Sequence, residues 1–113
     1  MKKIEAIIKP LKLSNVKDSL HEIGLSGMTI TDVKGFGRQR GSTGGIDPND
    51  GYDDEFLAKM KLEVIVEDNQ VDGVIESIKT SAYSGKIGDG KIFVSNIEQL
   101  IRIRTGEKDS DAV

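Results

Sequence analysis

Hydrophobic residues alternate with polar ones in several short stretches of the chain, and each such stretch predicts a strand. Residues 2–9 show this alternation and end at Pro10, which cannot donate to a strand ladder. Residues 28–34 are rich in β-branched residues, which favour strands. The alternation resumes at residues 60–66, and a short apolar stretch at residues 92–94 predicts a fourth, buried strand.

Two other stretches carry hydrophobic residues at a spacing of three or four, which predicts amphipathic helices. The first stripe contains Leu13, Val16, Leu20 and Ile23, and the second contains Val71, Val74, Ile75, Ile78 and Ala82. The expected N-caps are Ser14 and Asp68, and the expected stops are Gly24 and Gly85. His21 lies off the first stripe, so we expect it to be exposed.

The predicted order is strand, helix, strand, strand, helix, strand, which is the order of the ferredoxin-like fold. We therefore expect one α+β domain over residues 1–113, with two helices on one face of a four-stranded sheet. Both faces of the strands carry apolar residues, as Ile7 beside Ile8 illustrates. The face without helices needs a cover, and oligomerisation would supply it.

The connection between the second and third strands is unusually long. The stretch GFGRQRGSTGGIDPNDGYDDEFLAK, Gly35 to Lys59, has neither strand nor helical periodicity. Connections beyond roughly 12–15 residues without their own structure are functional or disordered in most proteins. We expect a loop over about residues 37–58, and a polar, mobile tail over about residues 105–113.

Composition and charge narrow the possible functions. The chain has 113 residues, no cysteine, one histidine and a net charge of −3. These features argue against a thiolate metal site, a Ser-His-Asp triad and general nucleic-acid binding. The N-terminus meets Glu5 and Pro10 too early for a signal peptide, and no apolar run approaches a membrane span. We expect a cytoplasmic protein without direct membrane insertion.

The stretch GKIGDGK, Gly85 to Lys91, has the G-x-x-x-x-G-K spacing of a Walker A loop. Ile92 stands where that motif needs Ser or Thr, and the stretch runs from a helix into a strand instead of from a strand into a helix. Three glycines still allow backbone amides to converge on an anion, and Lys86 and Lys91 add positive charge. A glycine-rich turn without a ligand is the alternative.

Two further stretches suit phosphate. GFGRQRG, Gly35 to Gly41, combines three glycines with two arginines, although a solvated hinge would look the same. In IRIRTGE, Arg102 and Arg104 would share one face if the segment is a strand; residues 97–103 also fit a helical turn. Each of these three elements could also be a turn, hinge or exposed segment without a ligand. Their occurrence together in one small acidic domain favours nucleotide binding.

The candidates for catalysis are few. The acidic residues of the long connection form a run instead of a positioned pair. A small ferredoxin-like hydrolase would need a nucleophile or base that we cannot identify. We therefore expect a protein that is not an enzyme.

Four stretches in this order resemble the PII signal-transduction family of nitrogen-regulatory proteins. They are MKKIEAIIKP at the start, GMTITDVKGFGRQRG at residues 27–41, GKIGDGKIFV at residues 85–94 and IRIRTGE at residues 101–107. With KLEVIVEDNQVD they span nearly the whole chain outside the long connection. The tail RTGEKDSDAV is most similar to cyanobacterial or plastid members.

The resemblance implies a homotrimer with ATP or ADP bound in the clefts between subunits. The residues it assigns to the nucleotide are Thr29, Gly35, Gly37, Arg38, Gln39, Ile65, Gly88, Asp89, Gly90, Lys91, Arg102 and Arg104. Residues 88–91 would line the phosphates, and the last two arginines would reach them. Thr29 and Ile65 would flank the base, and the stretch from Gly35 to Arg38 would close the cleft.

The resemblance also implies a second ligand, 2-oxoglutarate. The residues it assigns to this ligand are Gln39, Arg40, Gly41 and Lys59. Gln39 would ligate a Mg²⁺ ion shared with ATP, and Lys59 would pair with a carboxylate. The long connection would be the family's T-loop, which docks onto target proteins and changes shape with the bound ligand.

The long connection departs from the family pattern. GGIDPNDGYDDEF follows Thr43, is one residue longer than usual and lacks the usual arginine. Tyr52 occupies the place of the tyrosine that some family members modify, so it is a candidate for uridylylation or adenylylation. We expect the acidic tip to bind the partner through Asp50, Tyr52, Asp53, Asp54 and Glu55. Its charge suits a basic target surface, on a metabolic enzyme or a membrane transporter.

The function favoured by these residues is a sensor of ATP, ADP and 2-oxoglutarate that controls a target enzyme, transporter or transcription regulator. The alternative is a trimeric nucleotide-binding interaction module that does not respond to 2-oxoglutarate and has a different partner. Gln39 and Lys59 favour the sensor, because they supply a chelating group and a carboxylate partner.

Overall fold

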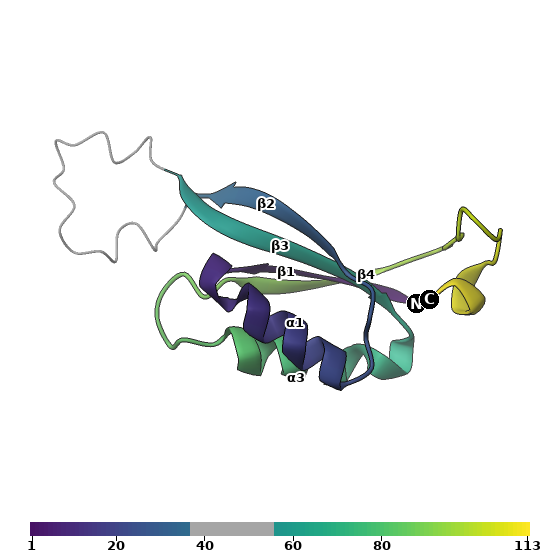
Figure 1. Ribbon diagram of the computed structural model, residues 1–113, viewed down its shortest axis with the longest axis horizontal. Coiled ribbons are helices and arrows are strands. Elements are labelled where there is room, and N and C mark those ends of the chain that lie inside the picture. The colour runs from purple at the N-terminus through teal and green to yellow at the C-terminus, as the bar shows by residue number, and fades with distance from the viewer. Residues whose placement is uncertain (37–55) are drawn as a thin grey trace, which may run out of the picture.

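The computed structural model describes residues 1–36 and 56–113. Its strands and main helices are β1 (Lys2–Ile8), α1 (Leu13–Glu22), β2 (Thr29–Gly35), β3 (Leu57–Val66), α3 (Val71–Ala82) and β4 (Lys91–Asn96) (Figure 1). Short 3₁₀ helices cover Pro10–Lys12, Asp68–Gln70 and Asp109–Ala112. The predicted element order is therefore confirmed, and β3 begins three residues before the expected Met60.

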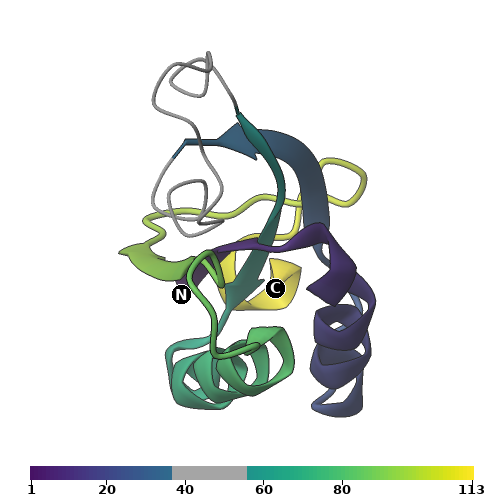
Figure 2. The ribbon, with the colours of Figure 1, turned by 90° about the vertical axis from the view of Figure 1, so that its left-hand side faces the viewer.

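The four strands form one antiparallel sheet in the order β2-β3-β1-β4. Both α1 and α3 lie on the same face of this sheet, as the end-on view in Figure 2 shows. This is a ferredoxin-like α+β fold, as the sequence predicted.

The hydrophobic core lies between the sheet and the two helices. Its buried residues are Ile4, Ala6, Ile8, Val16, Leu20, Leu62, Val64, Val66, Val74, Ile78 and Ala82. Register explains why these strand positions share a face, because Ile4 pairs with Val64 and Ala6 pairs with Leu62. His21 is exposed on α1, as predicted.

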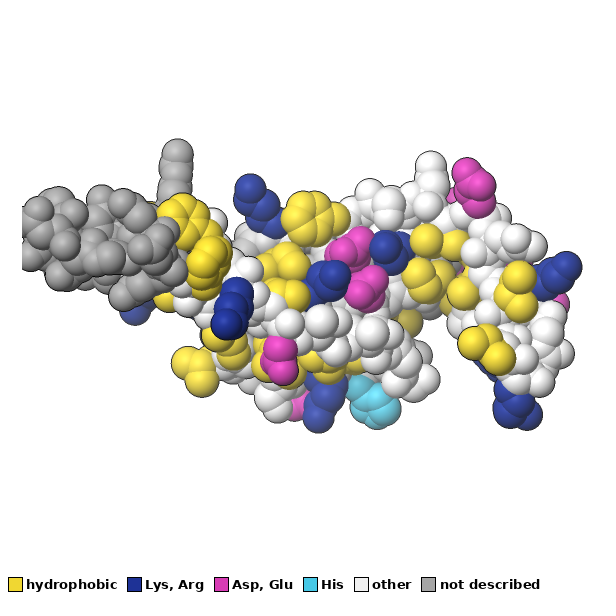
Figure 3. Space-filling model, turned by 90° about the horizontal axis from the view of Figure 1, so that it is seen from above, with side chains coloured by type: hydrophobic (Ala, Val, Ile, Leu, Met, Phe, Trp, Pro, Cys, Tyr) yellow, Lys and Arg dark blue, Asp and Glu magenta, His cyan; other side chains and the backbone are white. Residues whose placement is uncertain are grey.

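In the described part of the chain, no helix lies on the opposite face of the sheet. Charged residues occupy its centre, where the Lys3 Nζ lies 3.0 Å from Glu5 Oε1 and 3.7 Å from Glu63 Oε2. Phe93 projects from β4 on this face and is 48% exposed. Figure 3, which looks down on the uncovered side, shows charged and hydrophobic side chains interspersed. Such a mixed surface can pack against another protein surface.

The two helix starts differ from the prediction. A 3₁₀ turn begins at Pro10 and carries directly into α1, so Ser14 lies within the helix and is not its N-cap. At the second helix, Glu67 and Gln70 form a capping box around the 3₁₀ turn that precedes α3. Asp68 is therefore inside that turn and is not the cap.

The helix stops agree better with the sequence. Gly24 has φ +95° one residue beyond the C-cap Ile23 of α1, and its amide donates to the His21 carbonyl at 3.0 Å. In contrast, α3 ends at Ala82, three residues before Gly85. The extra residues Tyr83 and Ser84 belong to the loop described below.

The last part of the chain is neither strand nor helix over residues 97–104. Ile101 forms an isolated antiparallel bridge with Lys108, and residues 103–105 form a turn. The strand alternative for this segment is therefore wrong, and Arg102 and Arg104 do not share the face of a regular strand. The stretch predicted as a buried strand is β4, but Val94 is 44% exposed because β4 is an edge strand and no strand or helix of the described residues extends the sheet beyond it.

Candidate anion-binding site

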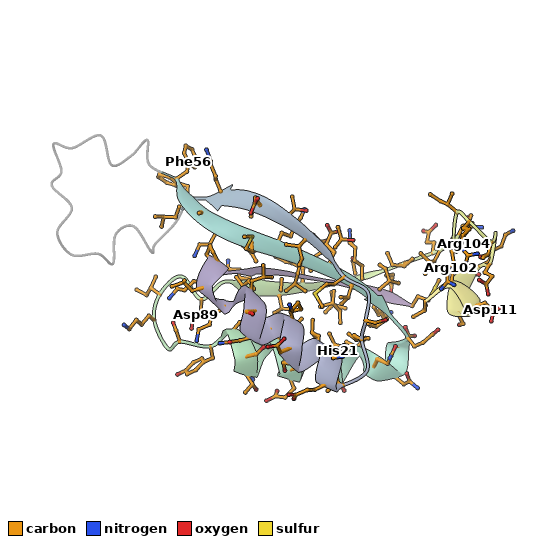
Figure 4. The ribbon with its side chains drawn as sticks, viewed as in Figure 1. His21, Phe56, Asp89, Arg102, Arg104 and Asp111 are labelled. Carbon is orange, nitrogen blue, oxygen red and sulfur yellow. The ribbon has the colours of Figure 1, made fainter. Side chains whose placement is uncertain are left out.

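The residues expected at the nucleotide fall into two groups at opposite ends of the sheet. Lys91 pairs with Ile7 of β1, whereas Ile65 pairs with Lys3, four residues away and thus roughly 13 Å along the strand. Figure 4 shows the same separation, with Asp89 at one end of the molecule and Arg102 and Arg104 at the other. One chain does not bring both groups to one phosphate.

The first group surrounds the glycine loop, which we define as residues 83–90 between α3 and β4. Gly85, Gly88 and Gly90 have φ values of +81°, +100° and +100°. A Cβ at Gly90 would lie 1.6 Å from the carbonyl oxygen of Ile7. Only glycine permits this close approach of the loop to β1.

Asp89 organises the glycine loop from within. Its Oδ2 accepts hydrogen bonds from the backbone amides of Ser84 and Gly85, each at 2.9 Å, and its Oδ1 accepts one from the Ser84 hydroxyl. The Lys9 Nζ lies 3.2 Å from Oδ1. Burial acts to raise the pKa of Asp89, but these hydrogen bonds outweigh it and hold the pKa well below its usual range.

Lys59 joins the glycine loop to the start of β3. Its ammonium donates to the Gly88 carbonyl at 2.7 Å, and the residue is only 9% exposed. Burial lowers the pKa of Lys59, the nearby Lys9 charge lowers it further, and Asp89 partly opposes both. Gly35 of β2 also reaches this place, since a Cβ there would lie 3.3 Å from the Lys59 side chain.

Two aromatic rings flank the long connection at this end of the sheet. Phe36 follows β2, Phe56 precedes β3, and their ring centroids are 5.9 Å apart. They bring the two ends of the long connection beside Gly35 and Lys59. The first group of site residues therefore lies at the base of that connection.

A cavity of about 230 Å³ lies next to the glycine loop. Its walls come from the end of β1, the last turn of α3, the loop and the start of β4. The lining residues are Ile7, Ile8, Ile78, Lys79, Ala82, Tyr83, Asp89, Gly90, Lys91 and Ile92. The cavity is mostly apolar, with charged groups at its loop side, as is common for small-molecule sites.

The second group lies at the far end of the sheet. Thr29 begins β2, and Ile65 projects from β3 on the uncovered face. The Arg102 guanidinium donates to Glu107 Oε1 at 3.3 Å and to the Ala112 carbonyl at 3.4 Å. Arg104 is exposed. These cations are thus presented outward, away from the glycine loop of their own chain.

Other predicted site residues lie outside the described residues. They are Gly37, Arg38, Gln39, Arg40, Gly41, Asp50, Tyr52, Asp53, Asp54 and Glu55. Their roles at the ligands, in modification and in partner binding therefore stay predictions. Within the described ranges, no helix combines the length and hydropathy that crossing a bilayer requires.

Sequence reasoning missed Lys9 and Ser84. Lys9 follows β1 and Ser84 follows α3, and their side chains meet at 3.0 Å although 75 positions separate them. A lysine directly before Pro10 and a serine directly before a glycine-rich stretch gave only a weak signal. The meeting of the two depends on the packing of α3 against β1.

Comparison with known proteins identifies the family. The family model described as "Nitrogen regulatory protein P-II" matches residues 1–107. Relatives of that name in Azospirillum brasilense and Mesorhizobium japonicum are 55% and 58% identical over 113 residues, covering 100% of both chains in each case. The "Crystal Structure of Arabidopsis thaliana PII bound to citrate" matches with a TM-score of 0.83 and 40% identity, over 99% of this chain and 91% of that chain. The chain therefore belongs to the nitrogen regulatory protein P-II family.

Proposed function

We propose that this protein is a non-catalytic cytoplasmic signal-transduction regulator that binds ATP or ADP together with 2-oxoglutarate and controls a target protein. The observation that carries the proposal is the glycine loop: three glycines at positive φ, followed directly by the exposed Lys91, at the base of the long connection. Convergent amides and a lysine suit the phosphates of a nucleotide. The loop lies where a bound ligand can influence the two ends of the long connection, at Gly35 and Lys59.

We infer that the nucleotide binds between copies of the chain. The glycine loop and the outward-facing arginines lie at opposite ends of one chain, so a second copy must supply the arginines if both groups contact one nucleotide. The uncovered sheet face, with its half-exposed Phe93, offers the surface for assembly. A homotrimer, as the family resemblance implies, satisfies both needs. Light scattering after size exclusion should give three times the mass of 12.3 kDa.

Lys59 is the described residue best placed for 2-oxoglutarate. Its buried ammonium is disfavoured by desolvation and by Lys9, and a ligand carboxylate would offset both effects. The citrate in the Arabidopsis relative shows that a family member binds a small polycarboxylate and supports this assignment. Gln39, outside the described residues, would hold Mg²⁺ with oxygen atoms of the two ligands. An amide oxygen and ligand oxygens suit this hard cation.

Calorimetry tests the proposal. ATP-Mg should bind the wild-type chain, and 2-oxoglutarate should bind only when ATP and Mg²⁺ are present. K59M should weaken 2-oxoglutarate binding by about 10–100-fold, because a charge-assisted hydrogen bond contributes roughly 1.5–3 kcal/mol. ATP binding should change much less.

The matched control is K61M, which removes the same charge two positions along β3, where Lys61 lies 3.9 Å from Glu63. It should leave 2-oxoglutarate binding intact. A chain that binds ATP but never 2-oxoglutarate would be the interaction module without a 2-oxoglutarate response. A chain that binds no nucleotide would refute the sensor.

The target is proposed from charge alone. The acids from Asp50 to Glu55 suit a partner with a basic surface, on an enzyme or a membrane transporter. Changing Asp53, Asp54 and Glu55 to neutral amides should abolish target capture without changing ATP binding. Capture that survives this change would move the contact elsewhere.

A further inference from the structure

The structure places a side-chain cluster beneath the glycine loop that the nucleotide site as proposed does not use. We propose that Ser84 is a positioning residue of this loop: with Lys9 it holds the Asp89 carboxylate inside the loop, so that the carboxylate does not oppose a bound polyphosphate. This inference rests on the proposed function, because it takes the glycine loop as a phosphate site. It changes the role of Asp89 from contacting phosphate to supporting the loop.

The Ser84 hydroxyl is fully engaged. It donates to Asp89 Oδ1, and it accepts hydrogen bonds from Lys9 Nζ at 3.0 Å and from the Lys86 amide at 3.3 Å. A hydroxyl has one proton to donate and two lone pairs, so these three contacts use its whole capacity. The Ser84 hydroxyl thus joins three groups by hydrogen bonds: Lys9 after β1, the backbone of the loop at Lys86, and Asp89.

An anion site that contains a carboxylate has an electrostatic problem, because like charges repel at short range. Here the two carboxylate oxygens accept four hydrogen-bond or ion-pair contacts from Lys9, Ser84 and Gly85. The Asp89 side chain is only 25% exposed. Within the described ranges, the backbone amides of Gly88 and Gly90 donate no hydrogen bond to another backbone group. The carboxylate is therefore occupied inside the loop, while these amides remain for a ligand.

The loop also needs an internal anchor. The backbone of a glycine has many accessible conformations when it is not held in place. Ordering the three glycines of this loop costs entropy, which opposes ligand binding unless contacts within the protein already order them. The Ser84–Asp89 contacts span the turn from its first residues to its last. They fix the loop before a ligand arrives, which lowers the entropy lost on binding.

The test measures ATP-Mg affinity of full-length variants by calorimetry. S84A should weaken binding by about tenfold, the scale of one lost hydrogen bond to a charged group. S84T, which keeps the hydroxyl, should recover affinity to within about twofold of the wild type. Inorganic tripolyphosphate should report the same order of affinities, because the effect concerns phosphate and not the base.

The matched control is S81A. The Ser81 hydroxyl, on the preceding helix α3, donates to the Ser77 carbonyl at 2.6 Å and forms no hydrogen bond to the described residues of the glycine loop. S81A should leave ATP affinity unchanged. Thermal unfolding of both alanine variants then separates a general loss of stability from a loss of positioning.

A double-mutant cycle tests whether Ser84 acts through Asp89. If it does, S84A in the D89N background should weaken ATP binding by less than about twofold beyond D89N alone. Additive losses would overturn the inference, as would S84A binding like the wild type or S84T binding like S84A. If the wild type binds neither ATP nor tripolyphosphate, the proposed function itself fails, which is a different result.

Discussion

The two cationic ends of this domain are built in opposite ways. The glycine loop is held by contacts between distant parts of the chain, from Lys9 after β1 and Lys59 on β3. The arginine end is held by local contacts, because Arg102 pairs with Glu107 and Ala112 of the following segment. Partly buried groups that share several hydrogen bonds keep their geometry. Exposed ion pairs are weak, and their side chains change partners readily. We infer that the loop is ready for a ligand and that the arginine end adjusts to one.

The largest effect should come from breaking the close approach at the loop end. G90A places a methyl group against the Ile7 carbonyl oxygen at a residue with φ +100°. We expect a loss of about 2–4 kcal/mol in the free energy of unfolding, from overpacking and backbone strain together. Urea unfolding measures this.

The control is G73A on α3, where a Cβ would meet nothing within 4 Å. It should stabilise the protein by about 0.5–1 kcal/mol, because alanine favours helices over glycine. Equal urea midpoints for G90A and the wild type would show that the loop does not need its contact with β1.

A smaller effect should follow from removing the charge that the loop encloses. In D89N an amide group replaces one carboxylate oxygen, so a donor faces the donors of Ser84, Gly85 or Lys9. We expect a loss of about 1–3 kcal/mol at pH 7, from an unsatisfied buried group. Chemical unfolding across a pH series measures it.

The pH dependence has a definite sign. Because folding lowers the pKa of Asp89 from 3.8, its stabilising contribution is complete above that value and is lost as the pH falls below it. The stabilities of wild type and D89N should therefore converge in acid. A constant gap between wild type and D89N at every pH would contradict an ionised, paired Asp89.

The smallest effect should come from the arginine end. E107Q weakens the exposed pair that holds Arg102, whose side chain is 43% exposed. A surface pair contributes about 0.2–1 kcal/mol, so releasing the guanidinium should tighten ATP binding by about two- to fivefold. Calorimetry at low and physiological salt measures this, with E22Q at the end of α1 as the control.

Weaker ATP binding in E107Q would reverse the comparison between the two ends. Glu107 would then orient Arg102 toward the ligand. The arginine end, like the glycine loop, would already hold its binding geometry before the ligand binds. The Thr105 hydroxyl, which donates to Glu107 at 2.8 Å, would be part of that preparation.

The sequence predicted the elements well where their physics is local. The alternation in β1 and β3 and the stripes of α1 and α3 each identified the correct element, because one buried face imposes a period of two or 3.6. It failed at the helix starts, where Pro10 and the Glu67–Gln70 capping box displaced the expected caps. Several residues can begin a turn, so neighbouring contacts decide among them.

The candidate site was predicted in part. The glycines of GKIGDGK indicated a tight turn without any structure, and Gly90 indeed tolerates no side chain, because a Cβ there would meet β1. Anion binding by this loop stays a prediction. The sequence did not indicate that Asp89 turns inward or that Ser84 and Lys9 hold it. That arrangement depends on a contact across 75 positions, which no local pattern encodes.

The sequence by itself determined the family and the order of strands and helices, because periodicity and motif spacing are properties of the chain. Only the tertiary structure decided that Lys9, Lys59 and Asp89 meet at one end of the sheet while Arg102 and Arg104 lie at the other. The physical reason is sheet order. With β1 between β3 and β4, the ends of β1 fix which loops become neighbours, and the two cationic ends of one chain are kept apart.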